Sequence, residues 1–274
     1  MTFYPDARPL LQAAYAGGYA LPAFNVCSLE MAKGCLEAAE TAGHPVILQT
    51  YPADIDQASP AVFAQMIRAL AGEVSVPVAL HLDHGQGAAQ VIACLRAGYS
   101  SVMFDGQGLA FGDVLEQTRR LSEIAHACGA SLEVSAESFG LSGAIDNVLE
   151  TTDPVQAARL YGAGADMVAC AVGSEHGHDS QIDLELLRRI AEQVRGPLVL
   201  HGGSGIAPGQ LARAQVSGVV KVNVGSALYR AVRLGWVDSG NLPTHRAGYA
   251  DVRARVRSVA AEYFQRLALP VSSS

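Results

Sequence analysis

Residues 77–84 read PVALHLDH, an apolar run that ends in two histidines and an aspartate. Such a run is typical of a buried strand, and His81 and Asp83 should share one face because side chains alternate along a strand. Two later segments, VGSEHGHD at 172–179 and LVLHGGSGI at 198–206, repeat the order of apolar run, histidine and glycine. The three segments favour a fold that brings several strand ends to one place.

Eight apolar runs alternate with segments of helical periodicity. The expected strands cover residues 19–26, 45–50, 77–84, 101–106, 131–138, 166–172, 197–202 and 219–225. Amphipathic segments lie between them, such as residues 28–43, where Ser28 suits an N-cap and Gly43 a stop. Apolar strands separated by such helices indicate parallel pairing with both sheet faces covered. The sequence therefore predicts the α/β class and a (β/α)8 TIM barrel.

The length and the two ends of the chain favour one domain with added helices. The chain has 274 residues, half of them apolar, and can bury one large core. Residues 6–18 predict a helix that covers the bottom of the barrel, and helical stretches around 226–235 and 250–267 follow the last strand. We predict a single barrel domain over residues 1–274 with a C-terminal helical extension at about 236–270.

Composition and charge exclude several classes of protein. The net charge of −7 and the pI of about 5.6 argue against a nucleic-acid-binding surface. The five cysteines form no CxxC pair, so neither disulfides nor a zinc knuckle are expected. No leader peptide or membrane-spanning apolar run is recognisable. We therefore expect a cytoplasmic protein that binds neither nucleic acid nor membranes.

Three histidines follow three of the expected strands. His84 ends the third strand, His176 follows the sixth, and His201 ends the seventh. In a TIM barrel the C-terminal ends of the strands form the mouth where catalytic groups gather. Three imidazoles with one open position are typical of catalytic zinc, although other divalent metals such as cobalt, iron or manganese also suit them. The sequence predicts a metal site formed by these histidines.

Asp83 and His81 should point into the upper layer of the barrel. A buried carboxylate costs free energy unless it is paired or functional. Asp83 is therefore a candidate acid/base, with the alternative that it orients a metal-binding histidine. We expect His81 to support the ligands rather than to bind metal, and His178 is a less favoured alternative to His176.

Glycine-rich turns follow the last two expected strands. They read GGSG at 202–205 and NVGSA at 223–227, and each precedes a helix start. Backbone N–H groups and the positive end of a helix dipole favour anions there. TIM barrels often bind phosphate after strands seven and eight, so the two turns predict a phosphate site.

Taken in order, these motifs resemble those of the class II, metal-dependent ketose-bisphosphate aldolases, which include fructose- and tagatose-bisphosphate aldolases. The similar segments are PAFNV, HLDHG, SVMFDG, HG after the sixth strand, LVLHGGSGI and KVNV, and they span about residues 5–235. The resemblance implies a zinc-dependent aldolase that reversibly cleaves a phosphorylated ketose to dihydroxyacetone phosphate and an aldehyde. It also implies a homodimer or a homotetramer.

The resemblance implies roles for individual residues. His84, His176 and His201 would hold zinc. Asp83 would exchange a proton with the substrate hydroxyl at the scissile bond. The residues that would bind the dihydroxyacetone phosphate half or line the site are Asn25, Asp105, Gly177, Gly202, Gly203, Ser204, Asn223, Gly225 and Ser226. As in relatives, Gly177, Gly202 and nearby carbonyls could also hold a monovalent cation.

The chain departs from the family pattern where the carbon base is expected. The family's EAELGRLGG and following acidic pair are replaced by EVSAESFGLSGAIDN at 133–147. If GLSG is placed on RLGG, Ile145 falls near the expected glutamate. Glu137, Asp146 and Glu150 are then the candidate bases, and they are not ranked by the sequence.

Other departures concern the aldehyde half of the site. The serine common after the second strand is absent from QTYPAD at 49–54, and a carboxylate common after the eighth strand is replaced at Gly225. The turn-rich segments 140–153 and 238–251 are expected to be loops near the chemistry. The donor half matches better than the acceptor half, so the aldehyde could differ from the usual glyceraldehyde 3-phosphate.

Two alternatives stay open at this point. Lys221 lies on the eighth expected strand and could form a Schiff base in a metal-independent aldolase, which borohydride would trap. The chain could instead be a non-catalytic, zinc-dependent sugar-phosphate binding protein, which would bind its ligand without turnover.

Overall fold

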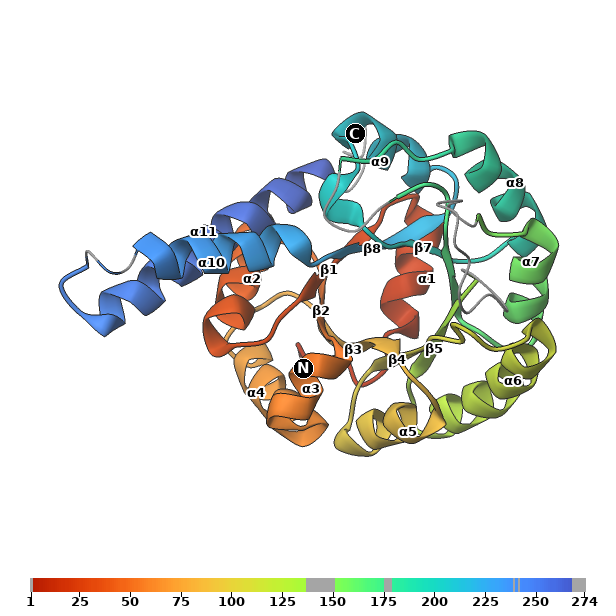
Figure 1. Ribbon diagram of the computed structural model, residues 1–274, viewed down its shortest axis with the longest axis horizontal. Coiled ribbons are helices and arrows are strands. Elements are labelled where there is room, and N and C mark those ends of the chain that lie inside the picture. Colours follow the sequence, from red (N-terminus) through yellow and green to blue (C-terminus); the bar gives the residue numbers. More distant parts are fainter. Residues whose placement is uncertain (1, 137–150, 175–178, 239, 241, 268–274) are drawn as a thin grey trace.

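The computed structural model describes residues 2–136, 151–174, 179–238, 240 and 242–267, and within them eight parallel strands close into one barrel (Figure 1). The strands are β1 (Leu21–Asn25), β2 (Val46–Thr50), β3 (Val78–Gly85), β4 (Ser101–Phe104), β5 (Ser131–Ser135), β6 (Met167–Cys170), β7 (Leu198–Leu200) and β8 (Val219–Val224). Each pairs with the next in the chain, and β8 pairs with β1. The predicted (β/α)8 TIM barrel is confirmed.

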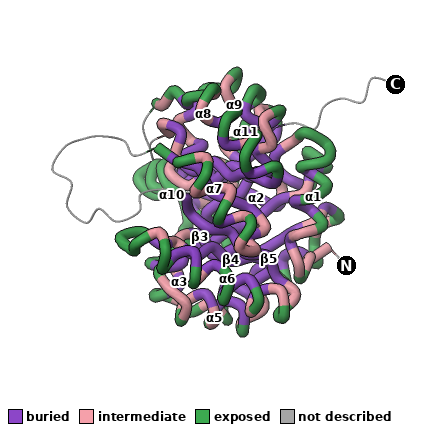
Figure 2. The backbone as a smooth tube through the Cα atoms, turned by 90° about the vertical axis from the view of Figure 1, so that its right-hand side faces the viewer, coloured by how far each residue is buried: buried purple, intermediate pink, exposed green. Residues whose placement is uncertain are grey.

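Helices surround the strands and bury them (Figure 2). They are α1 (Arg8–Gly17), α2 (Leu29–Ala42), α3 (Pro52–Ala58), α4 (Pro60–Ala71), α5 (Ala88–Ala97), α6 (Phe111–Ala127), α7 (Pro154–Gly162), α8 (Leu184–Val194), η1 (Gly203–Gly205, a 3₁₀ turn), α9 (Pro208–Gln215), α10 (Ser226–Asp238) and α11 (His245–Arg266). The predicted limits of α2 are confirmed, because the Ser28 side chain accepts from Met31 N–H and Gly43 ends the helix with a φ of 63°. Within the described residues, no helix has the length and apolar character needed to cross a membrane.

Helix α1 closes the bottom of the barrel, as predicted. Its buried side chains Leu10, Leu11 and Ala14 belong to one apolar cluster with inward-facing strand residues such as Ile47 and Val199. In Figure 1 the helix lies across the barrel interior. Because apolar side chains fill this end, polar groups of the strands gather toward the opposite mouth.

Helices α10 and α11 lie side by side and extend beyond the barrel next to α2 (Figure 1). The prediction of a loop over residues 238–251 is wrong in its second half, because α11 already begins at His245. The Thr244 side chain accepts a hydrogen bond from Ala247 N–H and so starts the helix five residues before the expected position. Gly34 allows α2 to approach α11, since a Cβ at this position would lie 2.8 Å from the Arg253 carbonyl oxygen.

Candidate active site

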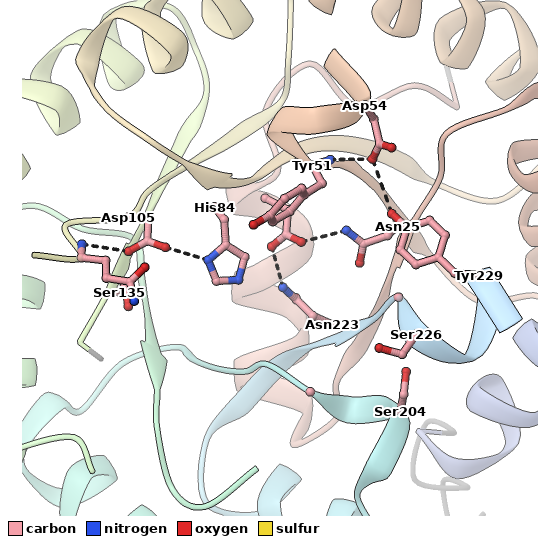
Figure 3. Close-up of a pocket in the computed structure, with 14 residues that line it drawn as sticks. Asn25, Tyr51, Asp54, His84, Asp105, Ser135, Ser204, Asn223, Ser226 and Tyr229 are labelled. Atoms are coloured by element: carbon pink, nitrogen blue, oxygen red, sulfur yellow. Dashed lines mark hydrogen bonds and ion pairs between the residues drawn. The ribbon is translucent and has the colours of Figure 1, made fainter. Parts of the chain in front are cut away.

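A cavity of about 610 Å³ opens at the C-terminal ends of the strands. Its lining residues are Asn25, Tyr51, Asp54, Asp83, His84, Asp105, Gln107, Ser135, Gly202, Ser204, Asn223, Gly225, Ser226 and Tyr229, and Figure 3 shows most of them converging from different strands. The mouth of the barrel therefore collects the polar groups that the sequence placed after separate strands.

His84 and Asp83 both reach this cavity although they are consecutive residues. Regular alternation would send them to opposite faces of β3. The pairing of β3 with β4 instead shifts register between Leu82 and Gly85, and His84 has a φ of 51°, which is uncommon for a residue other than glycine. Such a conformation is costly and persists where the surrounding structure enforces it, which points to a functional constraint.

Asp105, just after β4, orients the His84 ring. Its Oδ2 lies 2.7 Å from His84 Nδ1. Burial would raise the pKa of Asp105, but the hydrogen bond and charge of His84 together lower it below its ordinary value, so Asp105 is an acceptor near neutral pH. A ring held at Nδ1 would bind a metal through Nε2.

His201, just after β7, has a carboxylate partner of the same kind. Its Nε2 lies 3.1 Å from Glu133 Oε1, so it would bind a metal through Nδ1. The ring centroids of His84 and His201 are 4.6 Å apart. Ligand atoms of Asp83, His84 and His201 all lie within 4.8 Å of one another. Two imidazoles, each oriented by a carboxylate, suit a divalent metal such as zinc.

Asp83 is almost fully buried, with 4% of its surface exposed, and both carboxylate oxygens are held by amides. Asn223 Nδ2 donates to Oδ1 and Asn25 Nδ2 donates to Oδ2, each at 2.8 Å. The amides are oriented in turn, because Gln49 donates to the oxygen of Asn25 and Lys221 donates to that of Asn223. The carboxylate is therefore fixed at the cavity wall beside the two histidines.

Lys221 lies below the cavity in a buried ionic cluster. Its Nζ is 2.9 Å from Glu133 Oε2 and 2.6 Å from Asn223 Oδ1, and the side chains of Lys221 and Glu133 are fully buried. Lys221 does not line the cavity, so the geometry disfavours the Schiff-base alternative. His81 is fully buried and does not line the cavity, and its Nδ1 lies 2.8 Å from Ser101 Oγ. Burial, followed by the charge of Lys221, lowers the pKa of His81 well below its ordinary value.

The two glycine-rich turns meet at one end of the cavity. Ser204 Oγ accepts a hydrogen bond from Ala227 N–H at the start of α10, which joins the β7 and β8 turns. A Cβ at Gly203 would lie 2.7 Å from the Asn223 carbonyl oxygen, and one at Gly225 would lie 2.9 Å from Asn25 Oδ1. Only glycine lets the backbone pack this closely. The resulting cradle of hydroxyls and helix-start N–H groups suits a phosphate.

The structure brings most of the predicted site residues together. Those that line the cavity are Asn25, Asp83, His84, Asp105, Gly202, Ser204, Asn223, Gly225 and Ser226, while His201 and Gly203 lie directly beside it. Five candidates lie outside the described residues: Glu137, Asp146, Glu150, His176 and Gly177.

Several important residues were missed by sequence reasoning. Glu133 could have been found, because a carboxylate inside an otherwise apolar expected strand needs a buried partner. Tyr51 and Asp54 follow the second strand. In the sequence, their segment stood out only because it lacks the serine that is common there. Tyr229 lies one helical turn after Ser226, and nothing in its local sequence marks it.

Comparisons with known proteins agree with this geometry. Residues 6–268 match the family fructose-bisphosphate aldolase class-II. The chain is 34% identical over 232 residues to a fructose-bisphosphate aldolase of Streptococcus pneumoniae serotype 4, covering 80% of this chain and 78% of the relative. It is 33% identical over 269 residues to a fructose-bisphosphate aldolase of Mycoplasma pneumoniae, covering 92% of this chain and 91% of the relative. The crystal structure of the YdjI aldolase from Escherichia coli K12 superposes with a TM-score of 0.87 at 27% identity, over 98% of this chain and 99% of that one.

Proposed function

The chain belongs to the class II fructose-bisphosphate aldolase family and is an aldolase, and we propose that it cleaves a phosphorylated ketose reversibly to dihydroxyacetone phosphate and an aldehyde. The proposal rests mainly on the grouping of Asp83, His84 and His201, whose potential ligand atoms all lie within 4.8 Å of one another. The phosphate cradle lies in the same cavity.

We propose that zinc is the metal, held by His84, His201 and His176. The oriented imidazoles of His84 and His201 support this choice, and His176 is carried over from the family motif. A bound zinc ion supplies a Lewis acid that polarises the ketone and stabilises negative charge next to it. Another divalent metal would offer the same chemistry to these ligands.

Asp83 is proposed to move the proton of the hydroxyl at the scissile bond. In cleavage its carboxylate takes the hydroxyl proton as the carbon–carbon bond breaks, and in condensation it returns that proton to the aldehyde oxygen. Asn25 and Asn223 keep both carboxylate oxygens in place, so the transfer needs no rearrangement of the side chain.

The turns after β7 and β8 are proposed to bind the phosphate of the donor, with Ser204, Ser226 and the backbone of Gly202 and Gly203 as hydrogen-bond donors. A cation bound at Gly177 and Gly202 would support the same phosphate. The carbon-bound proton is proposed to be taken by Glu137, Asp146 or Glu150. Replacing each by its amide in turn identifies the base by the loss of donor proton exchange.

A condensation assay tests this function. Zinc-loaded protein is incubated with dihydroxyacetone phosphate and a panel of aldehydes, and new ketose 1-phosphate is detected by NMR. We expect product that a chelator abolishes and added zinc restores. Borohydride should trap no donor adduct on Lys221. Binding of the donor without bond formation under any aldehyde, or a reduced lysine adduct, would contradict the proposal.

We also propose that the chain assembles into a homodimer or homotetramer. On α10 the exposed fractions are 46% for Leu234, 44% for Trp236 and 71% for Val237, and on α11 Tyr249 is 45% exposed. Trp236 and Tyr249 pack edge to face with centroids 5.1 Å apart. Exposed apolar groups gathered on a projecting helix pair favour a protein contact. Light scattering after size-exclusion chromatography measures the mass directly.

A further inference from the structure

One side of the cavity is formed by Tyr51, Asp54 and Tyr229, which we call the acidic wall. Tyr51 and Asp54 begin α3 after β2, and Tyr229 lies in the first turns of α10. Figure 3 shows Asp54 and Tyr229 pointing toward each other on the side of the cavity away from Asp105 and Ser135. The wall has no assigned role in binding the donor or the metal.

The position of the wall identifies the part of the substrate that it meets. The phosphate cradle lies after β7 and β8. The proposed metal ligands His84 and His201 lie near the end of β3 and just after β7. Asp83 is hydrogen-bonded to Asn223 at the cradle end of β8 and to Asn25 at the end of β1. A ketose whose phosphate lies in the cradle and whose scissile hydroxyl meets Asp83 must extend its remaining carbons beyond Asp83. The acidic wall lines that remaining space.

The charge of this space is unsuited to a second phosphate. The described cavity lining contains three aspartates, Asp54, Asp83 and Asp105, and neither a lysine nor an arginine. The sequences of segments 137–150 and 175–178, which follow the fifth and sixth strands, contain no lysine or arginine either. Like charges brought together in a partly buried site are strongly unfavourable, so a phosphorylated aldehyde would be repelled.

The hydrogen bonding of Asp54 suits hydroxyl groups. Among the described residues, the Tyr51 N–H and the Tyr229 hydroxyl both donate to Oδ2, at 3.2 and 3.4 Å. Oδ1 is thereby directed to other donors, and an ionised carboxylate is an acceptor only. The bond from Tyr51 is also part of the α3 capping box, so Asp54 has a structural role that an asparagine oxygen can preserve. Burial, then the charge of Asp54, raises the pKa of Tyr229, which keeps it a donor.

We propose that the acidic wall selects an uncharged, polyhydroxylated aldehyde as the acceptor and rejects a phosphorylated one. The inference rests on the proposed aldolase function and adds the substrate class of its second half. Asp54 would accept a hydrogen bond from an acceptor hydroxyl, and Tyr229 would help to hold Asp54 in place. A site built to bond a hydroxyl discriminates strongly against ligands that cannot provide it.

The test compares two acceptors that differ by one phosphate. With saturating dihydroxyacetone phosphate, kcat/KM is measured for glyceraldehyde and for glyceraldehyde 3-phosphate. We expect the wild-type protein to favour glyceraldehyde at least tenfold, and Asp54→Asn to reduce this ratio at least tenfold. Asp56→Asn is the matched control, because it removes the same charge from an exposed position of α3 outside the cavity. It should leave the ratio unchanged.

Further measurements keep the result interpretable. Proton exchange of dihydroxyacetone phosphate in D2O needs no aldehyde. If the wild-type protein shows no exchange, the proposed aldolase function is refuted, independently of the role proposed for the acidic wall. Exchange by Asp54→Asn shows that this variant folds. Tyr229→Phe leaves the Asp54 carboxylate in place. This variant should lower kcat/KM for glyceraldehyde but should still discriminate against glyceraldehyde 3-phosphate. A wild-type preference for glyceraldehyde 3-phosphate, as an arginine from a partner subunit would produce, overturns the inference. An equal effect of Asp54→Asn and Asp56→Asn also overturns it.

Discussion

The Nδ1 atom of His84 lies 2.7 Å from Oδ2 of Asp105, a carboxylate of the cavity lining that fixes the imidazole ring. Loss of such a partner typically lowers metal affinity by about 10- to 100-fold. We expect Asp105→Ala to weaken zinc binding to this extent, measured by competition with a chromogenic chelator. Asp113→Ala, at an exposed position of α6, serves as the control. Equal zinc affinities in the two variants would contradict the assignment.

Asp83→Asn separates proton transfer from donor activation. The amide is similar in size but cannot take the hydroxyl proton, and positioned proton transfer contributes about 10²- to 10⁴-fold. We expect cleavage and condensation to fall by this factor while zinc stays bound. Carbon–proton exchange of dihydroxyacetone phosphate should fall much less. If exchange and condensation fall equally, Asp83 does not act at the aldehyde oxygen.

The buried ion pair below the cavity should control stability. Lys221→Met leaves Glu133 buried without its cation, and breaking a buried pair costs about 3–5 kcal/mol. The loss should appear in the free energy of unfolding measured by urea titration. The double variant Lys221→Met/Glu133→Gln should recover part of that free energy, because it no longer buries an unpaired carboxylate.

Lys33 provides the matched control, since it is the other lysine of the chain and pairs with Glu73 near the surface. An exposed pair contributes about 0–1 kcal/mol, so Lys33→Met should unfold almost like the wild type. A similar cost for both lysine variants would show that the Lys221 pair is not a buried stabilising element.

The pH dependence of stability should depend partly on His44. This side chain is 3% exposed, packs against Tyr19 and Phe264, and has Nδ1 2.8 Å from the Pro45 carbonyl oxygen. Burial lowers the pKa of His44 below its ordinary value of 6.5. The unfolded chain therefore takes up this proton first, so the contribution is complete above about pH 6.5 and is lost as the pH falls toward the lowered pKa.

His44→Gln should thus lose less unfolding free energy than the wild type between about pH 7 and pH 5.5, as measured by urea titration of metal-free protein. His245→Gln, at an exposed position at the start of α11, should keep the wild-type pH dependence. Parallel pH profiles for His44→Gln and the wild type would contradict this account.

The barrel was predictable because its signals are local and repeated. Apolar runs, the Ser28 cap and the Gly43 stop each act over a few residues, and the structure keeps them. The two glycine-rich turns that meet at the cavity, 202–205 and 223–227, were also predictable, because each follows a strand and precedes a helix start. These features depend on backbone conformation and not on distant partners.

Other features depend on contacts between distant segments and could not be read from the sequence. Strand alternation alone places Asp83 and His84 on opposite faces, and only the register shift against β4 brings both to the cavity. The pairing of Glu133 with Lys221 and His201 joins β5 to β8 and to the residue that follows β7. Tyr229 meets Asp54 across 175 residues of sequence. Such pairs are fixed by barrel closure rather than by local pattern.

Metal-dependent proton exchange tests the central claim most directly. Zinc-loaded protein is incubated with dihydroxyacetone phosphate in D2O, and the carbon-bound proton signal is followed by NMR. We predict enzyme-dependent loss of one proton, which chelation abolishes and zinc restores, and which His201→Ala cannot support. Absence of exchange in protein with verified zinc and bound donor would contradict the claim that this cavity activates dihydroxyacetone phosphate.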